Sequence, residues 1–107
     1  MGNPKDIAYV VDMYNDTYYP VFLVDKVKAE IEKVVQFLES GSHTITAIQE
    51  KFDVMTNAIN DLAEEFDEHD SEIETVARES IGDTVDNILR VYGIAIDVET
   101  AIQERDW

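Results

Sequence analysis

The sequence between Thr44 and Glu68, TITAIQEKFDVMTNAINDLAEEFDE, carries the most regular apolar pattern in the chain. Large apolar residues recur with alternating spacings of three and four, which places them on one face of an α-helix. These residues are Ile45, Ile48, Phe52, Met55, Ile59, Leu62 and Phe66. The pattern predicts a long amphipathic helix over about residues 44–68, with the hydroxyl of Thr44 or Thr46 capping its first turn.

A second long helix is predicted upstream, over residues 21–39. Its apolar stripe consists of Val24, Val27, Ile31, Val34, Val35 and Leu38. Pro20 can open this helix, because a proline needs no hydrogen-bond partner at the start of a helix. Gly41 follows its last turn and is the candidate for a left-handed residue that ends it.

A third long helix is predicted over about residues 72–92. Ser71 and Glu74 match the Ser-x-x-Glu pattern of a capping box, and Gly93 follows the last apolar position. Gly82 lies inside this helix, where a glycine costs about 1 kcal/mol relative to alanine. We therefore expect Gly82 to allow close packing of another helix.

Short helices are predicted at both ends, over about residues 4–15 and 97–105, with Asp97 as the N-cap of the second. No stretch alternates with the period of a β-strand, and the dipeptides typical of hairpin turns are absent. The sequence therefore predicts one all-α domain over residues 1–107. Its expected architecture is an antiparallel bundle of three long helices with short N- and C-terminal helices.

Composition excludes several classes of function. The chain has 24 acidic and 8 basic residues and a net charge of −16, which excludes general nucleic-acid binding and disfavours anionic membranes. No apolar stretch is long enough to span a membrane. The absence of cysteine excludes thiolate chemistry and disulfides, and it is typical of cytoplasmic proteins. We therefore expect a cytoplasmic protein whose partner is basic.

Twelve of the acidic residues lie between Lys51 and Arg90, where Arg78 is the only base. At about 100° per residue, most of them fall opposite the apolar stripes of the two helices that carry them. The sequence therefore predicts an acidic ridge, defined as these twelve residues, that faces solvent.

The main functional hypothesis is a small acidic protein-interaction module, of inhibitor or immunity type, without catalytic activity. Its ridge would bind a basic protein. Aromatic residues in the N-terminal segment and at the C-terminus either pack onto the core or extend this surface. The candidate partner-binding residues are Asp61, Glu64, Glu68, Glu72, Tyr18, Tyr19 and Trp107. A further hypothesis is a helical subunit of a larger assembly, such as a homo-oligomer.

An enzymatic alternative comes from a local motif. Glu64, Glu65 and Glu68 have the form Glu-Glu-x-x-Glu, and a later helix carries Glu79 and Asp83. This resembles the all-α nucleoside-triphosphate pyrophosphohydrolases of the MazG type. The resemblance implies a magnesium ion held by Glu64, Glu65, Glu68 and Asp83, with a metal-bound water attacking phosphorus. The interval from Glu79 to Asp83 is one residue longer than the Glu-x-x-Asp of that family. Outside this alternative we expect no cofactor.

Three separated blocks carry a second resemblance that covers nearly the whole chain. They are YYPVFLVDKVK at residues 18–28, INDLAEEFDE at 59–68 and SEIETVARE at 71–79, followed by a closing RDW at 105–107. The combination resembles a small uncharacterised bacterial family of all-helical proteins. This resemblance implies the helical fold and implies no mechanism. Asp70 stands where we expect a glycine in the turn.

Overall fold

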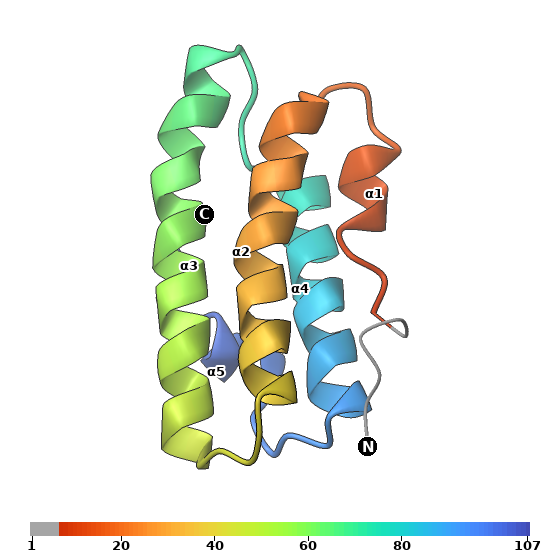
Figure 1. Cartoon of the computed structure of the whole chain (residues 1–107). Coiled ribbons are helices and arrows are strands. Elements are labelled where there is room, and N and C mark those ends of the chain that lie inside the picture. Colours follow the sequence, from red (N-terminus) through yellow and green to blue (C-terminus); the bar gives the residue numbers. More distant parts are fainter. Residues whose placement is uncertain (1–6) are drawn as a thin grey trace.

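The computed structural model describes residues 7–107, and all regular secondary structure within that range is helical (Figure 1). The helix α3 runs antiparallel to both α2 and α4. The predicted all-α bundle of three long helices with short helices near both ends is therefore confirmed. The elements are α1 (Val11–Tyr14), α2 (Val21–Glu39), α3 (Ile45–Glu68), α4 (Thr75–Val91) and α5 (Val98–Ala101).

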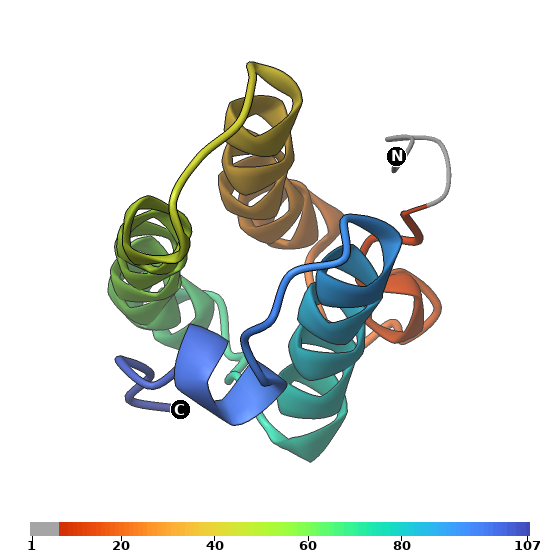
Figure 2. The same cartoon turned by 90° about the horizontal axis from the view of Figure 1, so that it is seen from below.

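The two short helices close gaps between the long ones. Figure 2 looks along the bundle and shows α1 beside α4, with α5 on the other side of α4. The helix α1 contacts α2 and α4, whereas α5 contacts α3 and α4. Both ends of the described chain therefore pack against the same helix, α4.

One apolar core unites these elements. Six of the seven apolar residues predicted on α3 are buried, and the exception is Ile45 at the first turn. Phe52 and Phe66 have no exposed surface, and burial of a side chain of this size stabilises the fold by roughly 1.5–3 kcal/mol. The described helices include none that is long and apolar enough to cross a membrane.

The residues predicted to end α2 and to cap α3 lie at the observed ends of these helices. The bounds of α2 match the prediction, and Gly41 beyond it adopts a φ of 151°, a positive value that glycine tolerates. The hydroxyl of Thr44 accepts a hydrogen bond from the N–H of Ala47 at 3.1 Å, so Thr44 rather than Thr46 caps α3.

The end of α3 has the geometry of a glycine turn without a glycine. Asp70 has a φ of 58°, in the left-handed region. The N–H of Ser71 donates to the carbonyl of Phe66 at 2.9 Å, and that of Asp70 donates to the carbonyl of Asp67 at 3.1 Å. These two bonds form a Schellman motif. The helix α4 ends in the same motif, with Gly93 in the left-handed position at a φ of 62°.

The predicted capping box at the start of α4 is wrong. The helix begins at Thr75 rather than near residue 72, and the side chain of its N-cap residue Glu74 makes no capping hydrogen bond. Ser71 is unavailable because its N–H ends α3 and its buried hydroxyl donates to the carbonyl of Tyr18 at 3.3 Å. The hydroxyl of Tyr19 instead accepts a hydrogen bond from the N–H of Ala77 at 3.2 Å. A side chain distant in the sequence therefore supplies an acceptor for a backbone N–H in the first turn of α4.

The predicted N-terminal helix is also too long. Residues 4–6 of that prediction lie outside the described residues, and α1 itself begins only at Val11. Val10 has a φ of 38°, which is incompatible with a continuous right-handed helix. Its N–H donates to the hydroxyl of Thr84 on α4 at 2.9 Å, so a tertiary contact fixes this conformation.

The C-terminal helix is shorter than expected, although its start is confirmed. A helix over residues 97–105 was predicted, and α5 ends at Ala101. The carboxylate of Asp97 accepts a hydrogen bond from the N–H of Thr100 at 2.7 Å. This bond lowers the pKa of Asp97 and identifies it as the N-cap.

Asp70→Gly should stabilise the protein by about 0.5–1 kcal/mol, because glycine adopts the left-handed conformation without steric cost. Urea denaturation of both proteins measures the difference. Asp67→Gly is the matched control: it removes the same charge from the helical part of the same turn and should destabilise by about 1 kcal/mol. An unchanged or lower stability of Asp70→Gly would contradict the proposed strain at Asp70.

The pair Tyr14–Asp25 should be visible in alkaline denaturation. The Tyr14 hydroxyl donates to the Asp25 carboxylate at 2.6 Å, and burial together with this bond raises the pKa of Tyr14 to about 12. Because the unfolded tyrosine ionises near pH 10, this contribution to stability is complete below pH 10 and is lost as pH rises towards 12.

The free energy of unfolding should therefore fall less steeply between pH 10 and 12 in Tyr14→Phe than in the wild type. Asp25→Asn keeps an acceptor oxygen but removes the charge, so its slope should lie between the two. Equal slopes in the wild type and Tyr14→Phe would rule out this pair as a source of the pH dependence.

Candidate functional site

The acidic ridge faces outward, as its helical spacing predicts. Nine of its twelve residues are exposed, and the other three, Asp53, Glu65 and Asp86, are partly exposed. These three have partners: Glu65 pairs with Lys26 at 2.5 Å, Asp86 pairs with Arg90, and Asp53 accepts the amide of Gln49 at 2.9 Å.

The nine exposed acids make no ion pair with any residue in the range 7–107. Their charges are therefore uncompensated by neighbouring bases in the folded chain. Like charges one turn apart on a helix destabilise it by a few tenths of a kcal/mol per pair. Such pairs occur on the surface of both α3 and α4.

Exposed aromatic residues occur at and just before the start of α2, at the end of the bundle where α3 also ends (upper end of Figure 1). Tyr18 is 41% exposed and Phe22 is 47% exposed, and the ring of Phe22 meets the ring of His69 with 4.9 Å between centroids. Partial desolvation and the charges of Glu74 and Glu72 raise the pKa of Tyr18. We define the aromatic end as Tyr18, Phe22 and His69 with the nearby Glu72 and Glu74, together with Val21 and Glu68, which adjoin Phe22 and His69 in the sequence.

Tyr19 belongs to the core rather than to this surface. It is 3% exposed, and its ring meets that of Phe66 edge-on with 6.3 Å between centroids. Because its hydroxyl also accepts the Ala77 N–H, Tyr19 connects α3 to the start of α4. The ring that was a candidate for partner binding is therefore inaccessible.

The metal-ligand candidates are dispersed. Glu64 and Glu68 are exposed on α3, Glu65 pairs with Lys26 of α2, and Glu79 and Asp83 lie on α4. Within residues 7–107, no three acidic or histidine side chains converge on a position that could hold a metal ion. The geometry gives no support to the local resemblance to the MazG-type pyrophosphohydrolases.

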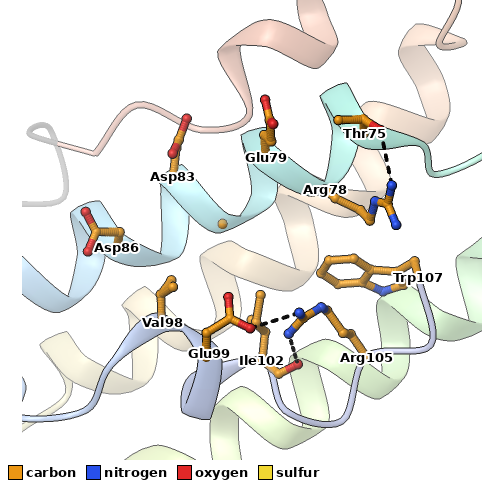
Figure 3. Close-up of a pocket in the computed structure, with 11 residues that line it drawn as sticks. Thr75, Arg78, Glu79, Asp83, Asp86, Val98, Glu99, Ile102, Arg105 and Trp107 are labelled. Atoms are coloured by element: carbon orange, nitrogen blue, oxygen red, sulfur yellow. Dashed lines mark hydrogen bonds and ion pairs between the residues drawn. The ribbon is translucent and has the colours of Figure 1, made fainter.

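A groove runs between α4 and the segment from α5 to the C-terminus (Figure 3). Its volume is about 570 Å³, and it is open to solvent. The residues that line it are mostly polar along the α4 edge, and those of the C-terminal segment include apolar ones. They are Thr75, Arg78, Glu79, Gly82, Asp83, Asp86, Val98, Glu99, Ile102, Arg105 and Trp107.

Trp107 forms one end of this groove, beside two arginines (Figure 3). The Arg105 guanidinium lies 6.0 Å from the centroid of the Trp107 ring and pairs with Glu99 at 2.9 Å. Arg78 donates to the hydroxyl of Thr75 at 3.1 Å. Trp107 is partly buried, and its indole nitrogen is fully buried without an acceptor among the described residues. The carbon atoms of the indole ring, rather than its N–H, therefore border the groove.

Gly82 does not serve the close packing that the sequence suggested. A methyl group at this position would meet no atom within 4 Å. The residue lies in the middle of α4 and borders the groove, so the absence of a side chain leaves the helix backbone open there (Figure 3). The expectation of helix packing at Gly82 is wrong.

Comparison with known proteins places the chain in a family. Residues 3–107 match the model described as "Family of unknown function (DUF5713)". The chain belongs to this family. No curated protein and no solved structure shows a significant match. The family resemblance seen in the three sequence blocks is thereby confirmed, and the family description assigns no site.

Sequence reasoning named the acids of the ridge, Tyr18 and Trp107 as candidates, but it did not predict the groove that Trp107, Glu79 and Asp83 line. The only signal that could have indicated it is Gly82, a glycine in a helix interior without an evident turn. Arg105 and Trp107 are close to α4 only because the chain reverses direction after α4, and their spacing in the sequence does not reveal this.

Gly82→Ala should stabilise the protein by about 0.5–1 kcal/mol, because alanine favours the helix and its methyl group has free space. Thermal denaturation measures the change. Gly93→Ala is the control: at a φ of 62° the same substitution should destabilise by about 1 kcal/mol. A destabilised Gly82→Ala variant would show that the groove is closed by a neighbouring element in solution.

Proposed function

We propose that the protein is a small acidic binding module that docks a basic protein at its aromatic end. The observation that carries this proposal is the juxtaposition of exposed aromatic rings with unpaired carboxylates. Tyr18 and Phe22 supply apolar contact area, Glu72 and Glu74 place negative charge beside Tyr18, and the exposed Glu68 precedes His69, whose ring meets Phe22. Interfaces commonly combine a central aromatic contact with a charged rim.

The charge of the whole chain supports a basic partner. A net charge of −16 attracts a basic protein over distances comparable to the Debye length and accelerates association. The same charge opposes contact between two copies at this end, because the acids of both copies would face each other. The proposed partner is therefore a different chain rather than a second copy of this one.

The chemistry of the partner follows from the residues of the aromatic end. An apolar side chain would cover Phe22 and Tyr18, and lysine or arginine side chains would pair with Glu68 and Glu72. Masking a basic surface in this manner is how an inhibitor or immunity-type protein acts. We place this role in the cytoplasm, which is consistent with a chain that lacks cysteine.

The proposal is tested with the full chain as bait in native lysate, followed by calorimetry with each protein that it retains. Glu68→Lys combined with Glu72→Lys should weaken binding at least about tenfold, and so should Phe22→Ala. Raising the salt concentration from 50 to 500 mM should weaken the wild-type complex as well, because exposed charges are screened.

The matched control is Glu39→Lys combined with Glu50→Lys, which makes the same charge change at exposed positions at the opposite end of α2 and α3. Binding of this control should stay close to that of the wild type. If the aromatic-end variants keep their partners, or if the control loses them equally, the aromatic end is not the docking surface.

A further inference from the structure

The end of the bundle opposite the aromatic end contains a hollow between two loops. The loop from α2 to α3 and the loop from α4 to α5 meet at this end, which faces the viewer in Figure 2. The hollow has a volume of about 460 Å³ and is open to solvent. Most of its wall is apolar and comes from the ends of three helices and the residues after α4. These apolar residues are Leu38, Ile45, Ile48, Tyr92 and Ile94.

The lining of this hollow carries no formal charge at pH 7. None of its nine residues is acidic, and none is a lysine or an arginine. The groove beside α5, by contrast, is lined by four acidic and two basic residues. Because 24 of the 107 residues are acidic, an uncharged concave surface differs from the rest of this molecule. An apolar group complements the hollow better than a basic one does.

Ile45 provides the apolar group that fits such a hollow. It lies in the first turn of α3 at the edge of the hollow and is 49% exposed, whereas Ile48 in the same wall is buried. A projecting apolar side chain beside an apolar hollow is complementary to a second copy of the same surface. A two-fold rotation then places Ile45 of each copy against the hollow of the other, which removes both from water.

The distribution of acids favours this end for contact between two copies. Five exposed acids between the end of α3 and the start of α4 lie at the far end of the bundle (Figure 1): Asp67, Glu68, Asp70, Glu72 and Glu74. The molecule is 40 Å long, and the Debye length at physiological salt is about 8 Å, so end-to-end contact leaves these acids screened from each other. The nearer acids Glu39, Glu50 and Asp97 lie outside the hollow and oppose association.

We propose that two copies of the chain associate end to end, with Ile45 of each copy in the hollow of the other. The bundle is 25 × 20 Å in cross-section, so the end offers roughly 500 Å² per copy and about 1,000 Å² in total. This area is at the lower limit for specific interfaces, so the dimer is weak, with a Kd of about 10–100 µM. It shares no residue with the aromatic end and requires no basic partner.

Sedimentation velocity of the full chain, from about 5 to 500 µM, tests the proposal. The average mass should rise from that of a monomer towards that of a dimer. Raising NaCl from about 50 to 500 mM should lower the Kd at least about threefold, because salt screens the acids beside the hollow. Binding of a basic protein at the aromatic end has the opposite salt dependence, so the two proposals fail separately. A monomer at every concentration would overturn the dimer.

Ile45→Glu should weaken dimerisation at least about tenfold, because it places a carboxylate in the partner's hollow. Ile45 is half-exposed, and an acid in the first turn interacts favourably with the helix dipole, so the fold should be retained. The matched control is Val54→Glu, the same change in charge at a position on α3 that is 63% exposed and remote from the hollow. Its Kd should change less than about twofold. Equal losses in the two variants, or a wild-type Kd in Ile45→Glu, would contradict the proposed contact.

Cross-linking tests the orientation of the dimer without changing its apolar residues. Because the chain has no cysteine, Ser42→Cys introduces a single thiol at the edge of the hollow. Thr17→Cys places one in the exposed loop before α2, at the opposite end. Under mild oxidation, Ser42→Cys should form a disulfide-linked dimer at least about fivefold faster than Thr17→Cys. Equal rates, or faster cross-linking of Thr17→Cys, would rule out end-to-end contact through the hollow.

Discussion

Burial of the apolar stripe of α3 is the interaction on which the rest of the structure depends. Phe52 near its start and Phe66 near its end are inaccessible to solvent, and the residues between them continue the same stripe. The helix α2 covers one side of this stripe, and α5 contacts α3 from the side of α4. The repulsion among the 24 acidic residues opposes compaction, so the core must exceed it. The fold limits that repulsion by directing the acids of the ridge to solvent, where water screens them.

Periodicity was sufficient to predict the long helices and most of the core, because each helix buries a single apolar stripe. It was insufficient where a distant residue determines the local conformation. Val10 adopts a left-handed conformation that its β-branched side chain disfavours, and the reason is a bond to Thr84. Ser71 has the sequence context of a helix cap, yet its hydroxyl bonds the carbonyl of Tyr18. In each case the deciding partner is more than fifty residues away, beyond any local pattern.

The candidate sites show the same division. The outward direction of the acids follows from helical geometry and was predictable. The separation of Tyr18 from Tyr19 was not, because adjacent aromatic residues in a loop carry no periodicity that indicates which ring is buried. The groove required three-dimensional information, since its walls come from α4 and from residues 98–107. The exposed backbone at Gly82 can be recognised as part of a groove only when residues 98–107 are placed beside α4.

The packing of both ends of the described chain against α4 has a consequence for the timing of folding. The α2–α3 hairpin contains contacts between neighbouring segments and can form early. The helix α4, however, contacts α1 on one side and α5 on the other, so its apolar face is fully covered only after α5 has been synthesised. Ribosomes add about 5–20 residues per second, so the 33 residues between the end of α3 at Glu68 and the end of α5 at Ala101 take roughly 2–7 seconds to be added. During that interval the hairpin has an incompletely covered core, and its high charge keeps neighbouring nascent chains apart.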